Sequence, residues 1–212
     1  MKKTAVLFDL DGTLWSACAT MLAPWNDTLT TFPGMERAPL TLPEMQSLMG
    51  KTLLEIARLL YPDAPADKAC EVVELACENE VPVLESKGGI LYDSVPDLLR
   101  GLKADHFVGI VSNCQCGYIE AFLTAHGLAD AIDGFLCEGM THLTKGQNIQ
   151  KIMADNGLAR AVYVGDTRGD ESAARAAGVP FIHAAYGFGD AAAPDAAIHS
   201  PAELPSLLHC FF

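Results

Sequence analysis

Two pairs of aspartates stand where short apolar runs of the sequence end. Asp9 and Asp11 follow the first run, and Asp166 and Asp170 follow a later one. On an extended backbone, residues two apart point to the same side, so the carboxylates of Asp9 and Asp11 lie close together. Like charges at that distance raise one of the two pKa values unless a cation lies beside them. Because Mg²⁺ prefers oxygen ligands, the two pairs predict a magnesium site built from all four aspartates.

The two pairs can share one site only if the strands that precede them are neighbours. Open α/β sheets bind ligands at the carboxyl ends of their strands, where the strand order reverses. A simpler interpretation explains part of the pattern. The pair Asp11-Gly12 is a turn signal, and Asp170 suits the cap of a helix that starts near Gly169. Neither point explains Asp9 at the end of a buried strand.

Three further polar residues add to this pattern. Ser112 and Asn113 end another apolar run and can donate hydrogen bonds to a phosphate oxygen, although capping of the next helix is an equal interpretation. Lys145 follows Thr144, which makes a capping-box pattern with Gln147. The lysine therefore falls in the first turn of a helix, where a cation opposes the helix dipole. A nearby anion would remove that conflict.

The elements that position these residues alternate between strands and helices. Short apolar, β-branched runs recur, and helical patterns follow most of them, which predicts an α/β fold with a doubly wound parallel sheet of about five strands. We expect the Ala-rich stretch 191–197 to be a surface connection and a capping box at Ser200 and Glu203 to start a closing helix. The predicted strands are Ala5 to Phe8, Phe107 to Val111, Gly134 to Cys137, Ala161 to Val164 and Pro180 to Ile182, and the predicted helix ends are Gly127, Gly157 and Gly178.

The distance between the first two strands indicates an insertion. Roughly ninety residues separate them, whereas a βαβ crossover needs only about thirty. Within the gap, Thr41 to Glu44 and Thr52 to Glu55 fit the capping box, and residues 66–84 carry a helical apolar pattern. We therefore expect an inserted all-helical cap domain over residues 15–88. Residues 1–14 and 89–212 are expected to form a Rossmann-like core.

Composition narrows the classes of partner. The 212 residues include 14 Lys and Arg against 27 Asp and Glu, a net charge of -13. Nucleic acids are bound through clusters of Lys and Arg, so a nucleic-acid partner is not expected. No apolar run reaches the roughly 18 residues of a membrane span. Seven cysteines without a metal-type pair favour reduced thiols. We expect a cytoplasmic protein with no membrane partner, and the sequence leaves its oligomeric state open.

The four motifs together resemble the haloacid dehalogenase-like hydrolase superfamily, in the subgroup typified by phosphoglycolate phosphatase and β-phosphoglucomutase. Asp9 to Leu14 fits the family's DxDGT signature, and Ser112 fits its strand-end Ser/Thr. Lys145 fits its basic residue, and Gly165 to Asp170 fits its GDxxxD motif. The resemblance covers nearly the whole chain and includes a helical cap after the first motif. It implies a magnesium-dependent phosphatase that acts on a small-molecule phosphate ester through an aspartyl-phosphate intermediate.

The resemblance also implies a role for each matching residue. Asp9 is the expected nucleophile and Asp11 the general acid and base, while Lys145 neutralises Asp9 and the phosphoryl oxygens. The expected metal ligands are the carboxylates of Asp9 and Asp166 and the backbone carbonyl of Asp11, with Asp170 binding directly or through water. The expected phosphate-positioning groups are Thr13, Ser112 and Asn113.

Substrate selection is expected to involve the cap. Lys51 follows Gly50 and precedes Thr52, which places it on the turn between two predicted cap helices. The corresponding turn of the resembling phosphatases faces the active site and touches the part of the substrate that does not react. A solvated turn lysine is an equal interpretation.

Three other functions fit part of the pattern. A sugar phosphomutase of the same family would return the phosphate to a second hydroxyl and would need a bisphosphate activator. A phospho-accepting receiver domain also uses Asp, Ser/Thr, Lys and magnesium, but it is shorter and lacks an inserted cap. A catalytically silent binding protein would keep the site without turnover. Trp15-Ser16 and Gly146-Gln147 depart from the usual phosphoglycolate phosphatase pattern, so the resemblance leaves the substrate open.

Overall fold

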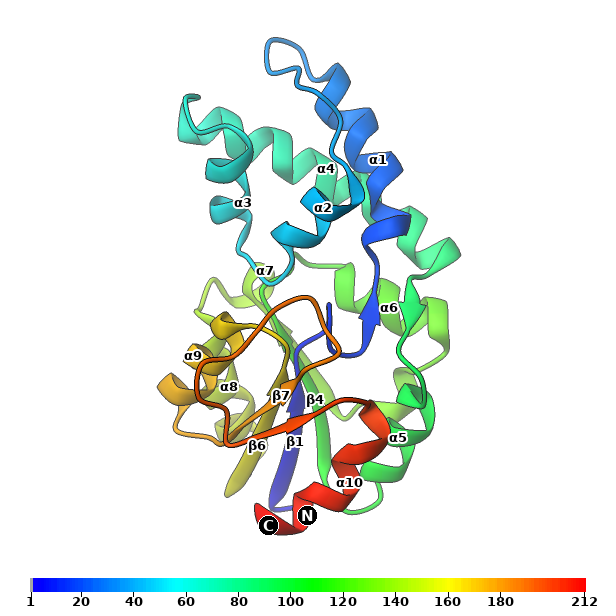
Figure 1. The fold of residues 1–212 in the computed structure, drawn as a ribbon, viewed down its shortest axis with the longest axis vertical. Helices are drawn as coiled ribbons and strands as arrows, with labels where there is room; N and C mark the ends of the chain where they lie inside the picture. The colour runs from blue at the N-terminus through cyan, green and yellow to red at the C-terminus, as the bar shows by residue number, and fades with distance from the viewer. Residues whose placement is uncertain (1) are drawn as a thin grey trace.

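The computed structural model describes residues 2–212, and its centre is a six-stranded parallel sheet. The first strand along the chain lies in the middle of the sheet (Figure 1). The next strands extend the sheet on one side of it, and the last three extend it on the other. In spatial order they are β5 (Gly134–Cys137), β4 (Phe107–Ser112), β1 (Thr4–Phe8), β6 (Arg160–Gly165), β7 (Phe181–Ala184) and β8 (Ala196–Ile198).

Both faces of the sheet are covered by helices, so the core has three layers. Alternate residues of β1 face opposite layers, as the two-residue period of a strand requires. Val6 and Phe8 belong to the core on the side of α5 (Val95–Leu102) and α6 (Tyr118–His126). Ala5 and Leu7 belong to the core on the side of α8 (Lys145–Asp155) and α9 (Arg168–Ala177). This burial on both faces explains why the strands read as continuous apolar runs.

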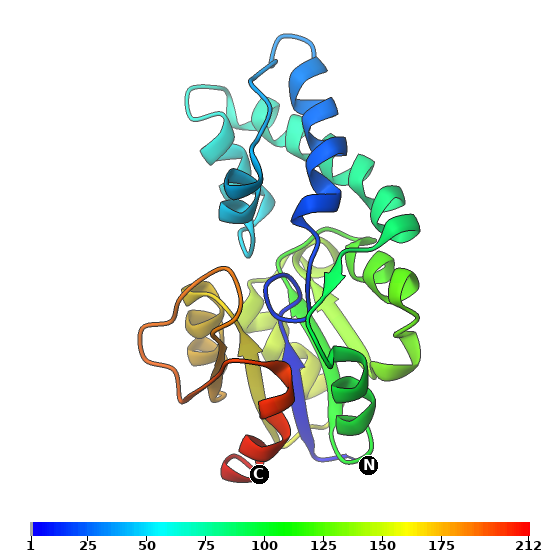
Figure 2. The same cartoon turned by 45° about the vertical axis from the view of Figure 1, so that its right-hand side comes forward.

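The chain leaves the sheet after β1 and forms a group of helices beyond the carboxyl ends of the strands (Figures 1 and 2). We call this group, residues 18–87, the cap. A two-stranded antiparallel sheet joins it to the core: β2 (Trp15–Ser16) leads in and β3 (Ile90–Leu91) leads out. The cap helices are α1 (Cys18–Thr31), α2 (Leu42–Leu48), α3 (Leu53–Leu60) and α4 (Ala66–Lys87).

Capping boxes determine where several helices begin. Thr41 starts α2, Thr52 starts α3 and Thr144 starts α8, and each has its side chain paired with the third helical residue. Such a pair satisfies two backbone donors that the first turn leaves free. These three starts agree with the sequence-based prediction. Gly127 and Gly178 likewise end α6 and α9 with positive φ.

Three local predictions were wrong. The insertion is not helical from its start, because Trp15 and Ser16 form β2 and the first helix begins at Cys18. The Ala-rich stretch is not a surface connection throughout, because its end pairs with β7 as the edge strand β8. Backbone pairing, which no local pattern of two or three residues reveals, stabilises both short strands. Ser200 makes no capping hydrogen bond with its side chain, so the predicted capping box does not form. The closing segment is helical as predicted, in three short pieces, η2 (Pro201–Glu203), α10 (Leu204–Leu207) and η3 (Leu208–Cys210).

Two short elements complete the core: η1 (Ala129–Ala131) precedes β5, and α7 (Glu138–Thr141) follows it.

Among residues 2–212, no helix has both the length and the apolar character needed to cross a bilayer.

Candidate active site

The site begins where β1 ends. The backbone N–H of Asp9 donates to the carbonyl of Val164 at 2.8 Å, so the pairing of β1 with β6 continues up to this residue. The chain then turns sharply at Gly12, whose φ of +80° suits glycine. A Cβ atom at Gly12 would collide with the carboxylate of Asp166. The glycine therefore lets the loop after β1 approach the end of β6.

The carboxylates of Asp9, Asp166 and Asp170 converge at these two strand ends. One oxygen from each lies within 4.8 Å of the others, and all three residues are buried. Asp9 Oδ2 and Asp166 Oδ1 are buried without a hydrogen-bond partner among the described residues. Buried carboxylate oxygens without partners are costly unless a cation binds them. Their chemistry and position therefore fit a hard divalent cation. The prediction that the two strands are neighbours is confirmed.

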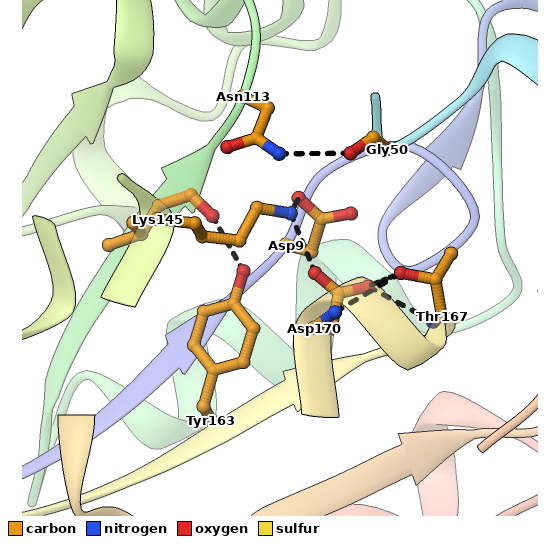
Figure 3. Close-up of polar contacts among 8 residues, drawn as sticks. Asp9, Gly50, Asn113, Lys145, Tyr163, Thr167 and Asp170 are labelled. Carbon is orange, nitrogen blue, oxygen red and sulfur yellow. Dashed lines mark hydrogen bonds and ion pairs between the residues drawn. The ribbon is translucent and has the colours of Figure 1, made fainter. Parts of the chain in front are cut away.

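Lys145 joins two of these aspartates (Figure 3). Its Nζ atom donates to Asp9 Oδ1 at 2.9 Å and to Asp170 Oδ1 at 2.6 Å. Burial alone would lower the pKa of Lys145, but the charges of Asp170 and Asp9 raise it above its ordinary value. The lysine is thus a fixed cation beside Asp9. These two carboxylates are the anions that offset the unfavourable interaction of this cation with the dipole of α8.

Asp170 has two structural partners. Its Oδ2 atom accepts from the N–H of Thr167 at 3.0 Å and from the hydroxyl of Thr167 at 2.6 Å, which closes the capping box of α9. Its Oδ1 atom accepts from Lys145. The helix-capping interpretation and the active-site interpretation therefore both hold for Asp170. The capping box of α9 fixes the carboxylate of Asp170 in the position from which it orients Lys145.

Burial raises the pKa values of the other aspartates. The pKa of Asp9 rises to about 6, because burial and Asp170 outweigh the lowering effect of Lys145. The pKa of Asp11 rises to about 7 through burial and the charge of Asp9. The pKa of Asp166 rises to about 8 for the same two reasons. A bound cation would favour the ionised forms at this site.

Asp11 lies apart from the carboxylate group of Asp9, Asp166 and Asp170. Its Oδ1 atom accepts a hydrogen bond from Tyr118 at the start of α6 at 2.9 Å, and the residue lines the cavity beneath the cap. The Tyr118 hydroxyl also lies 3.2 Å from the sulfur of Met21 on α1. The sequence-based set of metal ligands included Asp11, and the structure brings together the carboxylates of the other three.

A cavity of about 430 Å³ lies between the cap and the strand ends. Asp11, Ser112 and Asn113 line it from the core, and Lys51 lines it from the α2–α3 turn. The side-chain amide of Asn113 donates to the carbonyl of Gly50 at 2.9 Å and ties that turn to the end of β4 (Figure 3). Ser112 and Asn113 do not cap α6, because Gly117 does. The structure thus places all of the predicted phosphate-binding and cap residues except Thr13 around this cavity.

Thr13 lies in the loop after β1 and is not part of the cavity lining. Its Oγ1 atom is buried without a partner among the described residues. Its carbonyl accepts a hydrogen bond from Tyr186 at 2.8 Å, which holds the loop in place.

Comparison with known proteins identifies the family. Residues 6–184 match the family model of haloacid dehalogenase-like hydrolases. The chain belongs to this family. It is 30% identical to a phosphoglycolate phosphatase of Synechococcus elongatus over 213 residues, which cover 94% of each protein. It is 31% identical to a phosphoglycolate phosphatase of Xylella fastidiosa, covering 86% of this chain and 80% of the relative. The chain is a phosphoric monoester hydrolase of the haloacid dehalogenase-like family.

Solved structures share the fold of this haloacid dehalogenase-like hydrolase. A family member from Streptococcus pneumoniae superposes with a TM-score of 0.81 and 21% identity, covering 97% of this chain and 98% of the other. A CbbY protein of Rhodobacter sphaeroides, solved in complex with phosphate, superposes with a TM-score of 0.78 and 22% identity, covering 96% of each chain.

Sequence reasoning missed two residues of this haloacid dehalogenase-like site. Tyr118 carried no signal, because it reads as an ordinary core residue of α6. Glu80, in contrast, could have been predicted from its position in the sequence. It stands on the buried stripe of α4 formed by Val73, Cys77 and Leu84, at helical spacing. A carboxylate on an apolar stripe predicts a buried partner. Glu80 has two such partners, Trp25 and Gln115.

Proposed function

We propose that the protein hydrolyses a small-molecule phosphate monoester with Mg²⁺, through an aspartyl-phosphate intermediate on Asp9. The observation that carries the proposal is the arrangement at the strand ends. Lys145 bonds Asp9 through one carboxylate oxygen, while the other Asp9 oxygen is left without a partner. A buried carboxylate that a lysine keeps ionised is a group that can attack phosphorus.

The proposed reaction has two steps. In the first, Asp9 attacks the phosphorus of the ester, the bond to the alcohol oxygen breaks, and Asp11 gives its proton to that oxygen. In the second, Asp11 removes a proton from a water molecule, which attacks the same phosphorus and releases Asp9 and inorganic phosphate. Because the pKa of Asp11 is raised to about 7, the residue can give and take a proton near neutral pH.

Other residues position and neutralise the phosphoryl group. Lys145 offsets the charge of Asp9 as negative oxygens approach. Thr13 and Ser112 offer hydroxyl donors. Asn113 shares its amide between this role and its bond to Gly50. Lys51 is proposed to bind the substrate from the cap turn. Phosphoryl transfer depends mainly on such positioning and neutralisation.

The metal would be held by Asp9 and Asp166, each through its unpartnered oxygen, and by the carbonyl of Asp11. Both oxygens of Asp170 already accept hydrogen bonds, which favours its contact through water. When bound, Mg²⁺ would supply charge stabilisation for the phosphoryl oxygens.

A panel of phosphate esters tests this function. Phosphate release would be measured from phosphoglycolate, hexose phosphates, nucleotides and 4-nitrophenyl phosphate, with Mg²⁺ and with a chelator. We expect release from at least one ester with Mg²⁺ and its loss with the chelator. Turnover that requires a sugar bisphosphate activator would instead identify a phosphomutase. Activity that survives complete metal removal, or its absence on every ester, would contradict the proposal.

A further inference from the structure

The cavity has an inner wall on the cap side that the proposed reaction does not use. We define the inner wall as six side chains that line the cavity from α1, α4, the segment after β4 and the start of α6. Its central residue is Glu80 on α4, which is only 1% exposed although it carries a carboxylate. The inner wall comprises Met21, Trp25, Cys77, Glu80, Gln115 and Tyr118.

Hydrogen bonds fix Glu80 in this wall. The indole N–H of Trp25 donates to Oε2, and the amide of Gln115 donates to Oε1 at 2.6 Å. A carboxylate oxygen can accept more than one hydrogen bond, so each oxygen keeps acceptor capacity. The carbonyl oxygen of the Gln115 side chain has no recorded donor within residues 2–212 and is a further acceptor.

The strong donors of the inner wall are already used. Trp25 donates to Glu80, and the Gln115 amide donates to Glu80 and to the carbonyl of Cys77 at 3.4 Å. Tyr118 donates to Asp11. When Glu80 is ionised, a carboxylate on a substrate would meet no free N–H or O–H donor here, and its desolvation would be uncompensated.

The charges of the cavity also disfavour a carboxylate on the substrate. Four acidic residues line it, namely Asp11, Glu74, Glu80 and Glu138. The basic side chains in the lining, Lys51 and His142, belong to other elements, the α2–α3 turn and the loop after α7. The bond between Asn113 and Gly50 ties the α2–α3 turn to the end of β4, so Lys51 is placed over the strand ends rather than on the inner wall.

We propose that the inner wall selects phosphate esters whose alcohol ends in a hydrogen-bond donor, a hydroxyl or an ammonium group, and rejects esters that end in a carboxylate, with Glu80 as the specificity-determining residue. This inference rests on the proposed phosphatase function. It separates the protein from the relatives named phosphoglycolate phosphatase, because phosphoglycolate ends in a carboxylate.

Three esters of matched length test the inference: 2-aminoethyl phosphate, 2-hydroxyethyl phosphate and phosphoglycolate. They share two carbons after the ester oxygen and differ in the terminal group. Burial raises the pKa of Glu80 to about 8, so assays at pH 9 keep its carboxylate mostly ionised. The phosphate groups, with a second pKa of about 6, are then all dianionic. We expect kcat/KM to be about tenfold or more higher for the first two esters than for phosphoglycolate.

The variant Glu80→Gln removes the charge and keeps the shape. We expect it to lower the ratio of kcat/KM between 2-hydroxyethyl phosphate and phosphoglycolate about tenfold, mainly through KM. Glu78→Gln, on the exposed side of α4, is the matched control and should leave the ratio unchanged. Ratios within one enzyme cancel any general loss of activity.

Two results would overturn the inference. One is a wild-type enzyme that prefers phosphoglycolate, which needs no variant to detect. The other is a Glu80→Gln variant that changes all three esters in parallel, as a purely structural residue would. Should Glu80→Gln fail to fold, Glu80→Asp keeps the charge and must retain the wild-type order of esters. Failure of the phosphatase function itself would look different, because 4-nitrophenyl phosphate would then also remain intact.

Discussion

Asp9 and Asp11 are two residues apart, but their surroundings differ. Lys145 binds Asp9 and lowers its pKa against the effect of burial, whereas Asp11 lies toward the cap and is bonded by a tyrosine hydroxyl. Two carboxylates in different environments can divide the roles of nucleophile and acid. The difference follows from the neighbours of each side chain.

The substitution Asp9→Asn tests the nucleophile. The amide keeps the shape but cannot form the aspartyl phosphate, so we expect turnover to fall to background in steady-state assays. Asp97→Asn, on the exposed surface of α5, is the control and should keep wild-type turnover. More than a few per cent of residual activity in Asp9→Asn, with contaminating phosphatase excluded, would assign the nucleophile elsewhere.

The substitution Asp11→Asn tests proton transfer. A positioned acid or base contributes about 10² to 10⁴ in rate, so we expect kcat to fall within this range. The backbone carbonyl of the substituted residue remains, and the carboxylates of Asp9, Asp166 and Asp170 are untouched. We therefore expect the magnesium affinity, measured by calorimetric titration, to stay near normal. Lost metal affinity with preserved kcat would reverse the assignment.

At the scale of elements, the end of α2 and the capping box of α3 create a turn that lines the cavity. The end of α2 and the Thr52 cap of α3 leave Gly50 and Lys51 between them, and Gly50 has a φ of +75°. Asn113 then holds the turn against the end of β4. Local helix signals and one long-range hydrogen bond together place a cation on the lining of the cavity.

The substitution Lys51→Ala tests that placement. We expect kcat/KM for the preferred ester to fall about tenfold or more, equal to about 1.4 kcal/mol, because the cap turn loses its contact with the substrate. Hydrolysis of 4-nitrophenyl phosphate should change little. Lys87→Ala, at the exposed end of α4, is the control. Equal losses on both substrates, or no loss on either, would remove Lys51 from the site.

At the scale of the whole molecule, Glu80 connects the cap to the core. It lies on α4, and its partner Gln115 belongs to the segment after β4. Burial raises its pKa from 4.5 to about 8. The folded protein therefore binds a proton that the unfolded chain has released between these pH values. This group accordingly lowers the free energy of unfolding as the pH rises from about 4.5 to about 8.

The substitution Glu80→Gln should remove that slope. Urea unfolding of the wild type and the variant at pH 6 and pH 8.5 measures the effect. We expect the variant to gain stability relative to the wild type as the pH rises. Glu78→Gln should follow the wild type. A stability difference that is the same at both pH values would show that Glu80 titrates normally in the folded protein.

The sequence alone predicted the α/β fold, the insertion and the aspartates at the strand ends. These features follow from local rules: apolar runs form buried strands, Thr with Glu or Gln three residues later starts a helix, and parallel strands carry polar ligands at their carboxyl ends. The positions of Asp9, Asp166, Asp170 and Lys145 followed from these rules without knowledge of any contact.

The tertiary structure decided the features that depend on contacts between distant parts of the chain. Tyr118 lies 107 residues from Asp11, and Gln115 lies 35 residues from Glu80. No local pattern contains either pair, because only packing of the cap on the core determines which polar groups are buried together. The edge strand β8 likewise exists through pairing with β7. The carboxylates at the strand ends could therefore be predicted from the sequence, whereas the cavity wall required the folded chain.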